Sequence, residues 1–224
     1  MDIVEAINKR KTYRGYKTDP IPEKTLREIM ELALRAPSWA NTQPWEFAVV
    51  TGKKLDEIRK AFAERAADNE ATPDLAFPRT FPEPYRARLP AMRRPDADKV
   101  RDDKELRKER RLQGAKMYNC PCVIYIYTEL AFFRQDGQGL NVYPLFDCGL
   151  AAENIMLAAV KYGLGTTPAA QAVPYPDIIR KTLGLPESKL IVLGIFVGYP
   201  DQSNAQFSVY SGREPMDKMV KFFS

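Results

Sequence analysis

The sequence of 224 residues contains no histidine, and this absence excludes several kinds of active site. Ser-His-Asp and Cys-His nucleophilic catalysis, HExxH metal sites and imidazole general bases all need that side chain. The three cysteines, Cys120, Cys122 and Cys148, cannot form a four-ligand zinc site without histidine. An enzyme of this composition is therefore expected to carry its difficult chemistry on a bound organic cofactor.

Long apolar runs are also missing. No stretch approaches the roughly 18 apolar residues that a membrane-spanning helix needs, and the N-terminus lacks the apolar core of a signal peptide. An odd number of cysteines favours reduced thiols. These features predict a cytoplasmic protein with no membrane partner. With 45% hydrophobic and 28% charged residues, the composition is typical of a globular chain, and a single domain over residues 1–224 is expected.

Two common nucleotide-binding signatures do not occur. The sequence has neither GxGxxG nor GxxxxGK[ST], so a Rossmann dinucleotide site and a P-loop are not expected. Positive charge is concentrated in residues 79–116, which hold 13 basic and seven acidic residues. This excess is either a solvated helix and loop or an attraction for an anionic ligand. Nucleic acid is not the expected partner, because the stretch offers no aromatic stacking platform.

Hydrophobic periodicity predicts an α+β fold, a small central sheet packed by long helices. The first expected helix starts at Asp2 with a capping box. Further helices are expected over 26–34, 54–69, 96–118, 145–162 and 176–183. Expected strands cover 45–51, 123–128 and 190–197, the last buried on both faces. Residues 72–95 contain six prolines, too many for a continuous helix or a central strand. They predict an extended loop or lid.

Two polar segments are candidates for ligand binding. The first is the basic cluster Arg10, Lys11, Thr12 and Arg14 just past the first helix, where guanidinium groups can hold a phosphate. A solvated basic turn is the other interpretation. The second segment, APSWANTQPW at 36–45, lies between a helix and a strand and offers hydroxyl and amide groups to a ligand. Its polar side chains can instead satisfy the turn backbone.

Taken together, these segments resemble the FMN-dependent nitroreductase family. RKTYR at 10–14 is similar to the family's basic phosphate-binding segment, and residues 36–45 are similar to its flavin loop, which crosses the dimer. The resemblance continues through four further short motifs: Asp147-Cys148-Gly149, Gly163-Leu164-Gly165-Thr166-Thr167-Pro168, Gly198-Tyr199-Pro200 and Arg213-Glu214-Pro215. These motifs span nearly the whole chain.

The resemblance implies a mostly antiparallel central sheet and an intertwined homodimer with two FMN sites, each built from both subunits. NADH or NADPH would reduce the flavin, which would then reduce a nitroaromatic or related acceptor by a ping-pong mechanism. The cofactor-binding residues it implies are Arg10, Lys11, Thr12, Arg14, Pro37, Ser38, Trp39, Asn41, Thr167, Pro168, Ala169, Ala170 and Arg213. Of these, Pro37 to Asn41 would come from the partner chain, and Thr167 would approach the flavin N5 edge. No side chain is assigned as a catalytic acid or base.

The resemblance also places a variable lid at about 70–115. There, Tyr85 would stack on a small aromatic acceptor, and Arg86 or Arg88 would pair with a carboxylate if the acceptor is anionic. A proline-rich surface loop with a packed Tyr85 is the other interpretation. Two residues depart from the common pattern: Trp39 stands where many relatives have a small residue, and Thr12 where many have serine. A flavin-dependent reductive dehalogenase is an alternative, because Thr166-Thr167-Pro168 also resembles the deiodinase branch. A non-catalytic anion- or nucleic-acid-binding module is a more distant one.

Overall fold

The computed structural model describes residues 1–66, 71–78, 80–88, 102–135, 139–203 and 212–224. Its centre is a four-stranded sheet in the order β1-β2-β6-β5. The strands are β1 (Glu46–Thr51), β2 (Cys122–Glu129), β5 (Gly165–Ala169) and β6 (Lys189–Gly198). All three neighbouring pairs are antiparallel. The expected α+β class and mostly antiparallel sheet are confirmed.

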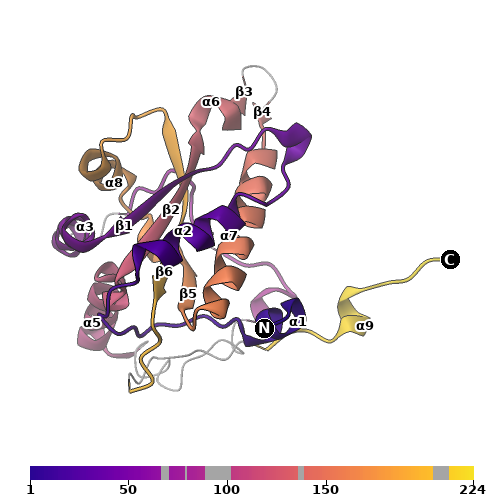
Figure 1. The fold of residues 1–224 in the computed structure, drawn as a ribbon, viewed down its shortest axis with the longest axis horizontal. Coiled ribbons are helices and arrows are strands. Elements are labelled where there is room, and N and C mark those ends of the chain that lie inside the picture. Colours follow the sequence, from indigo (N-terminus) through magenta and orange to yellow (C-terminus); the bar gives the residue numbers. More distant parts are fainter. Residues whose placement is uncertain (67–70, 79, 89–101, 136–138, 204–211) are drawn as a thin grey trace.

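Helices cover both faces of this sheet (Figure 1). One face packs against α3 (Gly52–Ala66), α5 (Lys104–Ala115) and α8 (Pro176–Leu183). The other packs against α2 (Glu23–Ala33) and α7 (Tyr143–Lys161), and α1 (Ile3–Lys9) lies beside α7. Shorter elements include α6 (Leu130–Phe133), α9 (Met216–Met219), a hairpin of β3 (Arg134–Gln135) and β4 (Gly139–Leu140), and 3-10 turns at Trp39–Asn41, Met117–Asn119 and Ala170–Ala172.

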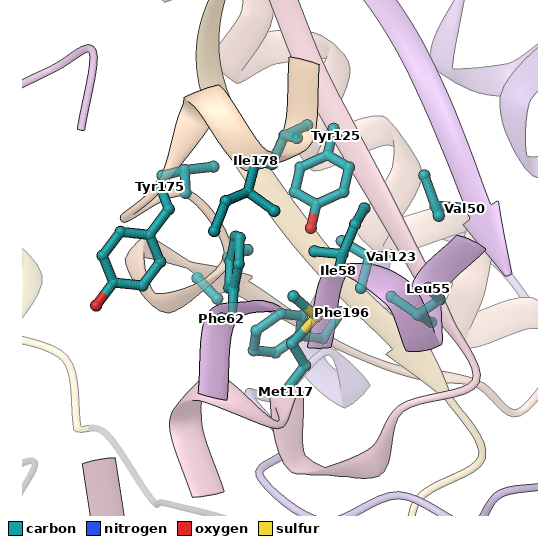
Figure 2. Packing of buried hydrophobic residues seen from close by; sticks show 14 of the residues in the cluster. Val50, Leu55, Ile58, Phe62, Met117, Val123, Tyr125, Tyr175, Ile178 and Phe196 are labelled. Carbon is teal, nitrogen blue, oxygen red and sulfur yellow. The ribbon is translucent and has the colours of Figure 1, made fainter. Parts of the chain in front are cut away.

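Alternation along β2 divides the core into these two layers, because successive side chains of a strand point to opposite faces. Cys122, Ile124 and Ile126 belong to the cluster under α2 and α7. Val123 and Tyr125 belong to the cluster under α3 and α8. Figure 2 shows this second cluster, in which α3 side chains meet those of the sheet and α8. Both faces of β2 are buried, so its sequence is a continuous apolar run.

The ends of several helices follow from local chemistry. Asp2 caps α1 by accepting a hydrogen bond from the Glu5 amide at 2.8 Å, as the capping box predicts. Gly163, at a φ of 70°, follows the end of α7 in the left-handed conformation that glycine adopts without strain. The predicted helix over 96–118 needs correction: Asp103 caps α5, which runs only from Lys104 to Ala115. Residues 96–101 lie outside the described residues.

The strand β5 is missing from the sequence prediction. Its residues, Gly-Thr-Thr-Pro-Ala, contain a glycine and a proline, so this segment alone is typical of a loop after a helix. β5 forms because it pairs with β6, Thr167 lying opposite Phe196. It lies at the edge of the sheet, where a proline is tolerated in a strand.

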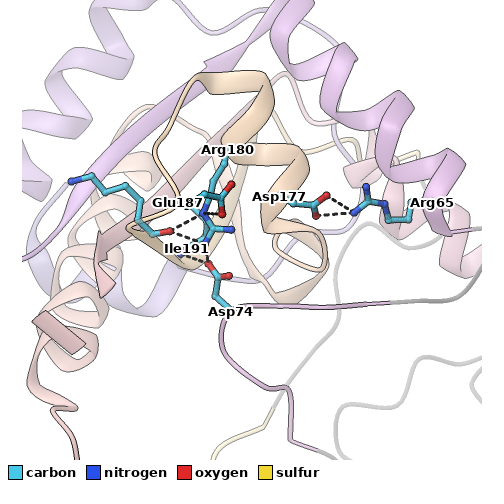
Figure 3. A network of polar contacts seen from close by, with 7 residues as sticks. Arg65, Asp74, Asp177, Arg180, Glu187 and Ile191 are labelled. Atoms are coloured by element: carbon cyan, nitrogen blue, oxygen red, sulfur yellow. Dashed lines mark hydrogen bonds and ion pairs between the residues drawn. The ribbon is translucent and has the colours of Figure 1, made fainter. Parts of the chain in front are cut away.

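The proline-rich segment is hydrogen-bonded to the rest of the protein at its start. The Thr72 amide donates to the Pro174 carbonyl at 2.9 Å. The Asp74 carboxylate accepts a hydrogen bond from Arg180 and another from the Ile191 amide at 2.7 Å (Figure 3). These bonds fix the start of the segment to α8 and to the beginning of β6. Residues 89–101, in the middle of the expected lid, lie outside the described part of the chain. Within the described residues, no helix is both long and apolar enough to cross a membrane.

Candidate functional site

The basic segment after α1 runs alongside β5. Thr12 forms a parallel bridge with Thr166, and the Tyr13 amide donates to the Thr166 carbonyl at 3.3 Å. The Thr167 hydroxyl donates to the Tyr13 carbonyl. These contacts join residues that are more than 150 positions apart in the sequence. The structure therefore brings two of the predicted cofactor-binding segments together.

The same segment is also tied to the chain beyond β6. The Lys17 amide donates to the Tyr199 carbonyl at 2.9 Å, and the Asp201 amide donates to the Gly15 carbonyl at 3.1 Å. Tyr16 forms an antiparallel bridge with Pro200. Residues 12–17 are thus held between β5 and the end of β6, and the conformation of the basic cluster is set by backbone pairing on two sides.

Close approach explains two of the glycines in the predicted motifs. A Cβ atom on Gly165 would lie 2.6 Å from Cδ2 of Tyr13, and one on Gly198 would lie 2.9 Å from Cδ1 of Tyr16. Contacts below 3.0 Å between such atoms require a displacement of the neighbour. Glycine at both positions therefore lets the aromatic rings of the basic segment lie against the sheet.

The side chains of the basic cluster differ in exposure. Lys11 is exposed, whereas Thr12 and Arg14 are half-buried. Arg10 is mostly covered and lies 3.7 Å from the Glu153 carboxylate on α7. Together these side chains offer two guanidiniums, one ammonium and one hydroxyl, which are donors of the kind that bind a phosphate monoester. The cluster can therefore hold an anionic group next to the end of α1.

A hydrogen-bonded pair of hydroxyls lies beneath this cluster. Tyr16, buried at 4% exposure, has its hydroxyl 2.7 Å from that of Thr167, and 2.9 Å from the Tyr13 carbonyl oxygen. Burial raises the pKa of Tyr16 well above its ordinary value, and the Thr167 hydrogen bond opposes this shift only in part. The Thr167 hydroxyl is thus engaged inside the protein. In the predicted stretch Thr167, Pro168, Ala169 and Ala170, the residues Pro168 and Ala170 are exposed, and Thr167 and Ala169 are buried.

The loop at 36–45 has an unusual backbone. Ala40, Asn41 and Gln43 all have positive φ, at 47°, 59° and 46°. The Ser38 hydroxyl accepts the Gln43 amide at 2.9 Å. Pro37, Trp39 and Asn41 are exposed and Ser38 is half-buried, so all four predicted residues reach the surface. Backbone strain of this kind persists only where the surroundings hold it, and it concentrates at functional sites.

A buried aspartate holds this loop. The Trp39 amide donates to both carboxylate oxygens of Asp147, at 3.2 and 3.3 Å, and Asp147 is only 5% exposed. The Trp39 ring lies over Tyr143, with 4.5 Å between the ring centroids. Both Asp147 and Tyr143 lie in the first two turns of α7. Burial, with a smaller contribution from the Asp147 charge, raises the pKa of the Cys148 thiol to about 12.

The loop and the basic segment do not meet within one chain. Trp39 contacts the first turns of α7, whereas Thr12 pairs with β5, which begins after the other end of that helix. α7 has 19 residues and is therefore about 28 Å long. Figure 1 shows the two segments toward opposite ends of α7.

The predicted acceptor residues lie near the C-terminal segment. Tyr85 and Arg86 are exposed, and the Arg88 guanidinium lies 5.2 Å from the centre of the Tyr85 ring. Arg88 Nε also lies 3.4 Å from the carboxylate of Glu214, which pairs in addition with Lys218 at 3.2 Å. Arg213, predicted to close on a phosphate, is exposed next to this pair. The structure thus places the predicted acceptor residues beside the C-terminal segment.

Asp147 and Glu214 lie in the motifs Asp147-Cys148-Gly149 and Arg213-Glu214-Pro215, but no role is predicted for either, and Tyr16 lies in no predicted motif. One signal was available for Asp147, because it is a lone charge in the apolar stretch at 145–152. Tyr16 and Glu214 act through partners that are distant in sequence, and no local pattern indicates these contacts. Within the described residues, no group of three or more Cys, Asp or Glu side chains is placed to hold a metal ion.

Comparison with known proteins gives a consistent result. A model of the Nitroreductase family matches residues 7–199. The chain is 28% identical to nitroreductase NfnB of Mycolicibacterium smegmatis, over 96% of this chain and 90% of that protein. It is also 28% identical to a 4-nitrobenzoate reductase of a Nocardioides species, over 95% and 86% of the two chains. The crystal structure of the FMN-dependent nitroreductase NfnB from Mycobacterium smegmatis in complex with NADPH superimposes with a TM-score of 0.87, at 26% identity and full coverage of both chains.

Proposed function

The chain belongs to the nitroreductase family, and from this membership we propose that it is an oxidoreductase that binds FMN and takes electrons from NADH or NADPH. When bound, FMN supplies the hydride-transfer chemistry that no side chain of this histidine-free sequence offers. In the ping-pong scheme, the nicotinamide and the acceptor use the same site in turn. The protein is proposed to be cytoplasmic, with one FMN-binding domain over 1–224 and a lid at about 70–115.

One observation carries this proposal: the basic segment is fixed against β5 by backbone pairing. Arg10, Lys11, Thr12 and Arg14 would hold the FMN phosphate and ribityl groups, and Arg213 would approach the phosphate from the C-terminal segment. The donor chemistry of these residues fits a phosphate ester. The N5 edge of the ring would lie along Thr167 to Ala170. Because the Thr167 hydroxyl is engaged internally, a hydrogen bond to N5 would come from a backbone N–H of this stretch.

The other half of each site would come from a second copy of the chain. Pro37, Ser38, Trp39 and Asn41 lie too far along α7 to share a ligand with Thr12 of the same chain. The surface of α1, α2 and α7 is rich in exposed apolar side chains, which a dimer would cover. They are Ile3, Val4, Ile7, Leu32, Phe146 and Leu150. A groove of about 330 Å³ lies between these helices. An intertwined homodimer satisfies both observations.

The dimer has a direct test in light scattering. Ile7→Glu places a charge on α1, at a side chain that is 54% exposed, and should convert the dimer to a monomer and weaken FMN binding. Leu112→Glu, at a 38% exposed position on the opposite helical layer, is the matched control and should remain dimeric. A monomeric wild-type protein that still binds FMN would contradict the shared site.

A small aromatic acceptor, neutral or carrying a carboxylate, fits the residues near the lid. Tyr85 would stack on the ring, and Arg86 or Arg88 would pair with the negative group. The 4-nitrobenzoate reductase among the relatives supports an aromatic acid as the first acceptor to assay. Nitroaromatic reduction is thus the proposed reaction.

The decisive experiment is a visible absorption spectrum of the purified protein with FMN, followed by anaerobic addition of NADPH or NADH and then of 4-nitrobenzoate. We expect flavin bands that bleach with the nicotinamide and return with the acceptor. Arg14→Gln should weaken FMN binding by roughly tenfold or more, as loss of a charge-assisted hydrogen bond does. Lys24→Gln removes a charge of the same sign at an 88% exposed side chain on α2 and should have no effect.

The other outcomes separate the alternatives. Flavin bands that ignore nicotinamide, with turnover of a halogenated phenol under chemical reduction, would identify the reductive dehalogenase instead. A chain that takes up no FMN would leave only a non-catalytic anion-binding module. Nucleic-acid binding that falls steeply with salt would then be its signature.

A further inference from the structure

Asp147 is placed to control the conformation of the flavin loop. It is the fifth residue of α7, and helical side chains point back toward the N-terminus of their helix. Its carboxylate therefore faces the loop, and it accepts the Trp39 amide with both oxygens. At 5% exposure, the carboxylate has little water to hydrogen-bond with, so the Trp39 amide replaces part of the solvation that burial removes.

The loop needs such a support because its backbone is strained. Ala40 has a φ of 47° and a ψ of 27°, in the left-handed region that favours glycine. Asn41 and Gln43 also have positive φ. Three such residues in a stretch of four do not hold this shape unaided. The Asp147 bond acts at the residue before Ala40, and the Ser38 bond to the Gln43 amide closes the loop from the other side.

The held loop places the ring of Trp39 at the surface. Trp39 is 60% exposed although it is one of the largest apolar side chains. Its ring is supported from one side by Tyr143, which in turn lies edge-on to Phe146 at 6.0 Å. Tyr143 and Phe146 are themselves 48% and 62% exposed. The loop therefore displays an aromatic platform, and its orientation depends on the backbone of Trp39.

We propose that Asp147 is a positioning residue, whose buried carboxylate holds the strained 38–43 loop so that Trp39 is presented to the flavin site. This inference rests on the proposed function for the role of the flavin. The Trp39 backbone is fixed by Asp147, and its ring is fixed by Tyr143. In the proposed dimer, this platform reaches the flavin of the partner chain and limits that side of the site to planar groups.

The test uses the fact that the chain has only two tryptophans. The other one, Trp45, is 5% exposed, so a Trp45→Phe background leaves Trp39 as the sole tryptophan and keeps a large ring in the core. Acrylamide quenching of Trp39 fluorescence is then measured in the FMN-free protein. Asp147→Ala should increase quenching and weaken FMN binding by roughly 10- to 100-fold, the range for a hydrogen bond to a charged group. Asp147→Asn keeps an oxygen acceptor and should restore most of both properties.

A second substitution distinguishes positioning from general stability. Ala40→Gly removes the left-handed strain, so in the Asp147→Ala protein it should recover part of the quenching protection and of the FMN affinity. A loss that is merely structural would not respond to this change. If Asp147→Ala does not fold, Asp147→Ser, whose side chain is too short to reach the loop, must show the same loosening.

Two results would overturn the inference. One is unchanged Trp39 quenching in Asp147→Ala, and the other is no recovery with Ala40→Gly. Because quenching is measured without FMN, it remains informative if the protein binds no flavin. A flavin-free protein with an ordered Trp39 loop would count against the proposed function, and not against the role of Asp147 in holding the loop.

Discussion

The hydroxyl groups of Tyr16 and Thr167 lie 2.7 Å apart, although the residues are separated by 151 positions in the sequence. Both hydroxyls are also within hydrogen-bonding distance of the Tyr13 carbonyl oxygen. This small cluster fastens the basic segment to β5 from the inside of the protein. The placement of the proposed phosphate-binding residues thus depends on groups that a ligand does not touch.

Tyr16→Phe should reveal the contribution of this cluster. It removes one buried hydroxyl and leaves the ring, so we expect the free energy of unfolding to fall by about 1 kcal/mol, a typical value for one hydrogen bond. FMN binding should weaken as the basic segment loosens. Urea denaturation and FMN titration measure the two effects. Tyr85→Phe, at a 56% exposed position, is the control and should unfold at the wild-type urea concentration. Equal midpoints for the two variants would show that the buried hydroxyl contributes nothing.

Gly163 and Gly165 provide a matched pair for testing the packing of Tyr13. An alanine at 165 would place its Cβ 2.6 Å from the Tyr13 ring, so Gly165→Ala should destabilise the protein by about 1–3 kcal/mol and displace the basic segment. At Gly163 no atom lies within 4 Å of the added Cβ, and only its φ of 70° opposes alanine. Gly163→Ala should therefore cost about 1 kcal/mol with FMN affinity unchanged. Equal effects on FMN affinity would contradict the packing argument.

Local signals explain which parts of the fold were predictable. α2 could be predicted because Leu26, Ile29 and Ala33 recur at helical spacing, and all three are buried. β2 and β6 could be predicted because strands buried on both faces are continuous apolar runs. β5 could not, because its strand conformation depends on pairing with β6 and not on its own residues. The end of the predicted 96–118 helix was misplaced because no glycine or proline in residues 116–119 marks the stop after Ala115, where the chain turns at Met117 with a φ of 55°.

The candidate site also has parts that the sequence marks and parts that it does not. The basic cluster at 10–14 and the polar loop at 36–45 are contiguous in sequence, so their composition marks them. The contacts that hold them are not contiguous: Trp39 meets Asp147 across 108 positions, and Tyr16 meets Thr167 across 151. The engagement of the Thr167 hydroxyl by Tyr16 could only be found in three dimensions. The sequence therefore marks the residues proposed to contact a ligand better than it marks the residues that support them.

The Asp74–Arg180 pair should be a strong determinant of stability. The Arg180 side chain is only 9% exposed, and Asp74 also accepts the Ile191 amide (Figure 3). Asp74→Ala leaves the buried guanidinium with only the exposed Glu187 carboxylate at 3.9 Å, and loss of a buried partner typically costs about 3–5 kcal/mol. Urea denaturation measures this loss. Asp177→Ala removes a carboxylate paired with Arg65 at exposed side chains and should cost less than about 1 kcal/mol. A similar cost for both would mean that burial of the Arg180 pair has no energetic effect.

The Arg88–Glu214 pair predicts a charge-dependent effect on the acceptor. In the structure, Glu214 occupies the guanidinium that is proposed to bind a carboxylate. Glu214→Gln should free Arg88, so the KM for 4-nitrobenzoate should fall while the KM for uncharged nitrobenzene stays the same. Arg88→Gln should raise only the KM for the acid. Steady-state kinetics with both acceptors measures the difference. Parallel changes for the acid and the neutral compound would exclude a carboxylate role for Arg88.

Stability should fall at alkaline pH because the thiols are buried. Burial raises the pKa of Cys120 to about 11, against an ordinary value of 9.0. Between these two pH values the unfolded chain releases the thiol proton and the folded protein keeps it, so the free energy of unfolding decreases as pH rises. Below the ordinary pKa both states are protonated, and the thiol adds no pH dependence. Urea denaturation across this range should show the decrease, and Cys120→Ala should make it shallower. A slope that is unchanged in Cys120→Ala would show that the thiol ionises as readily in the folded protein as in the unfolded chain.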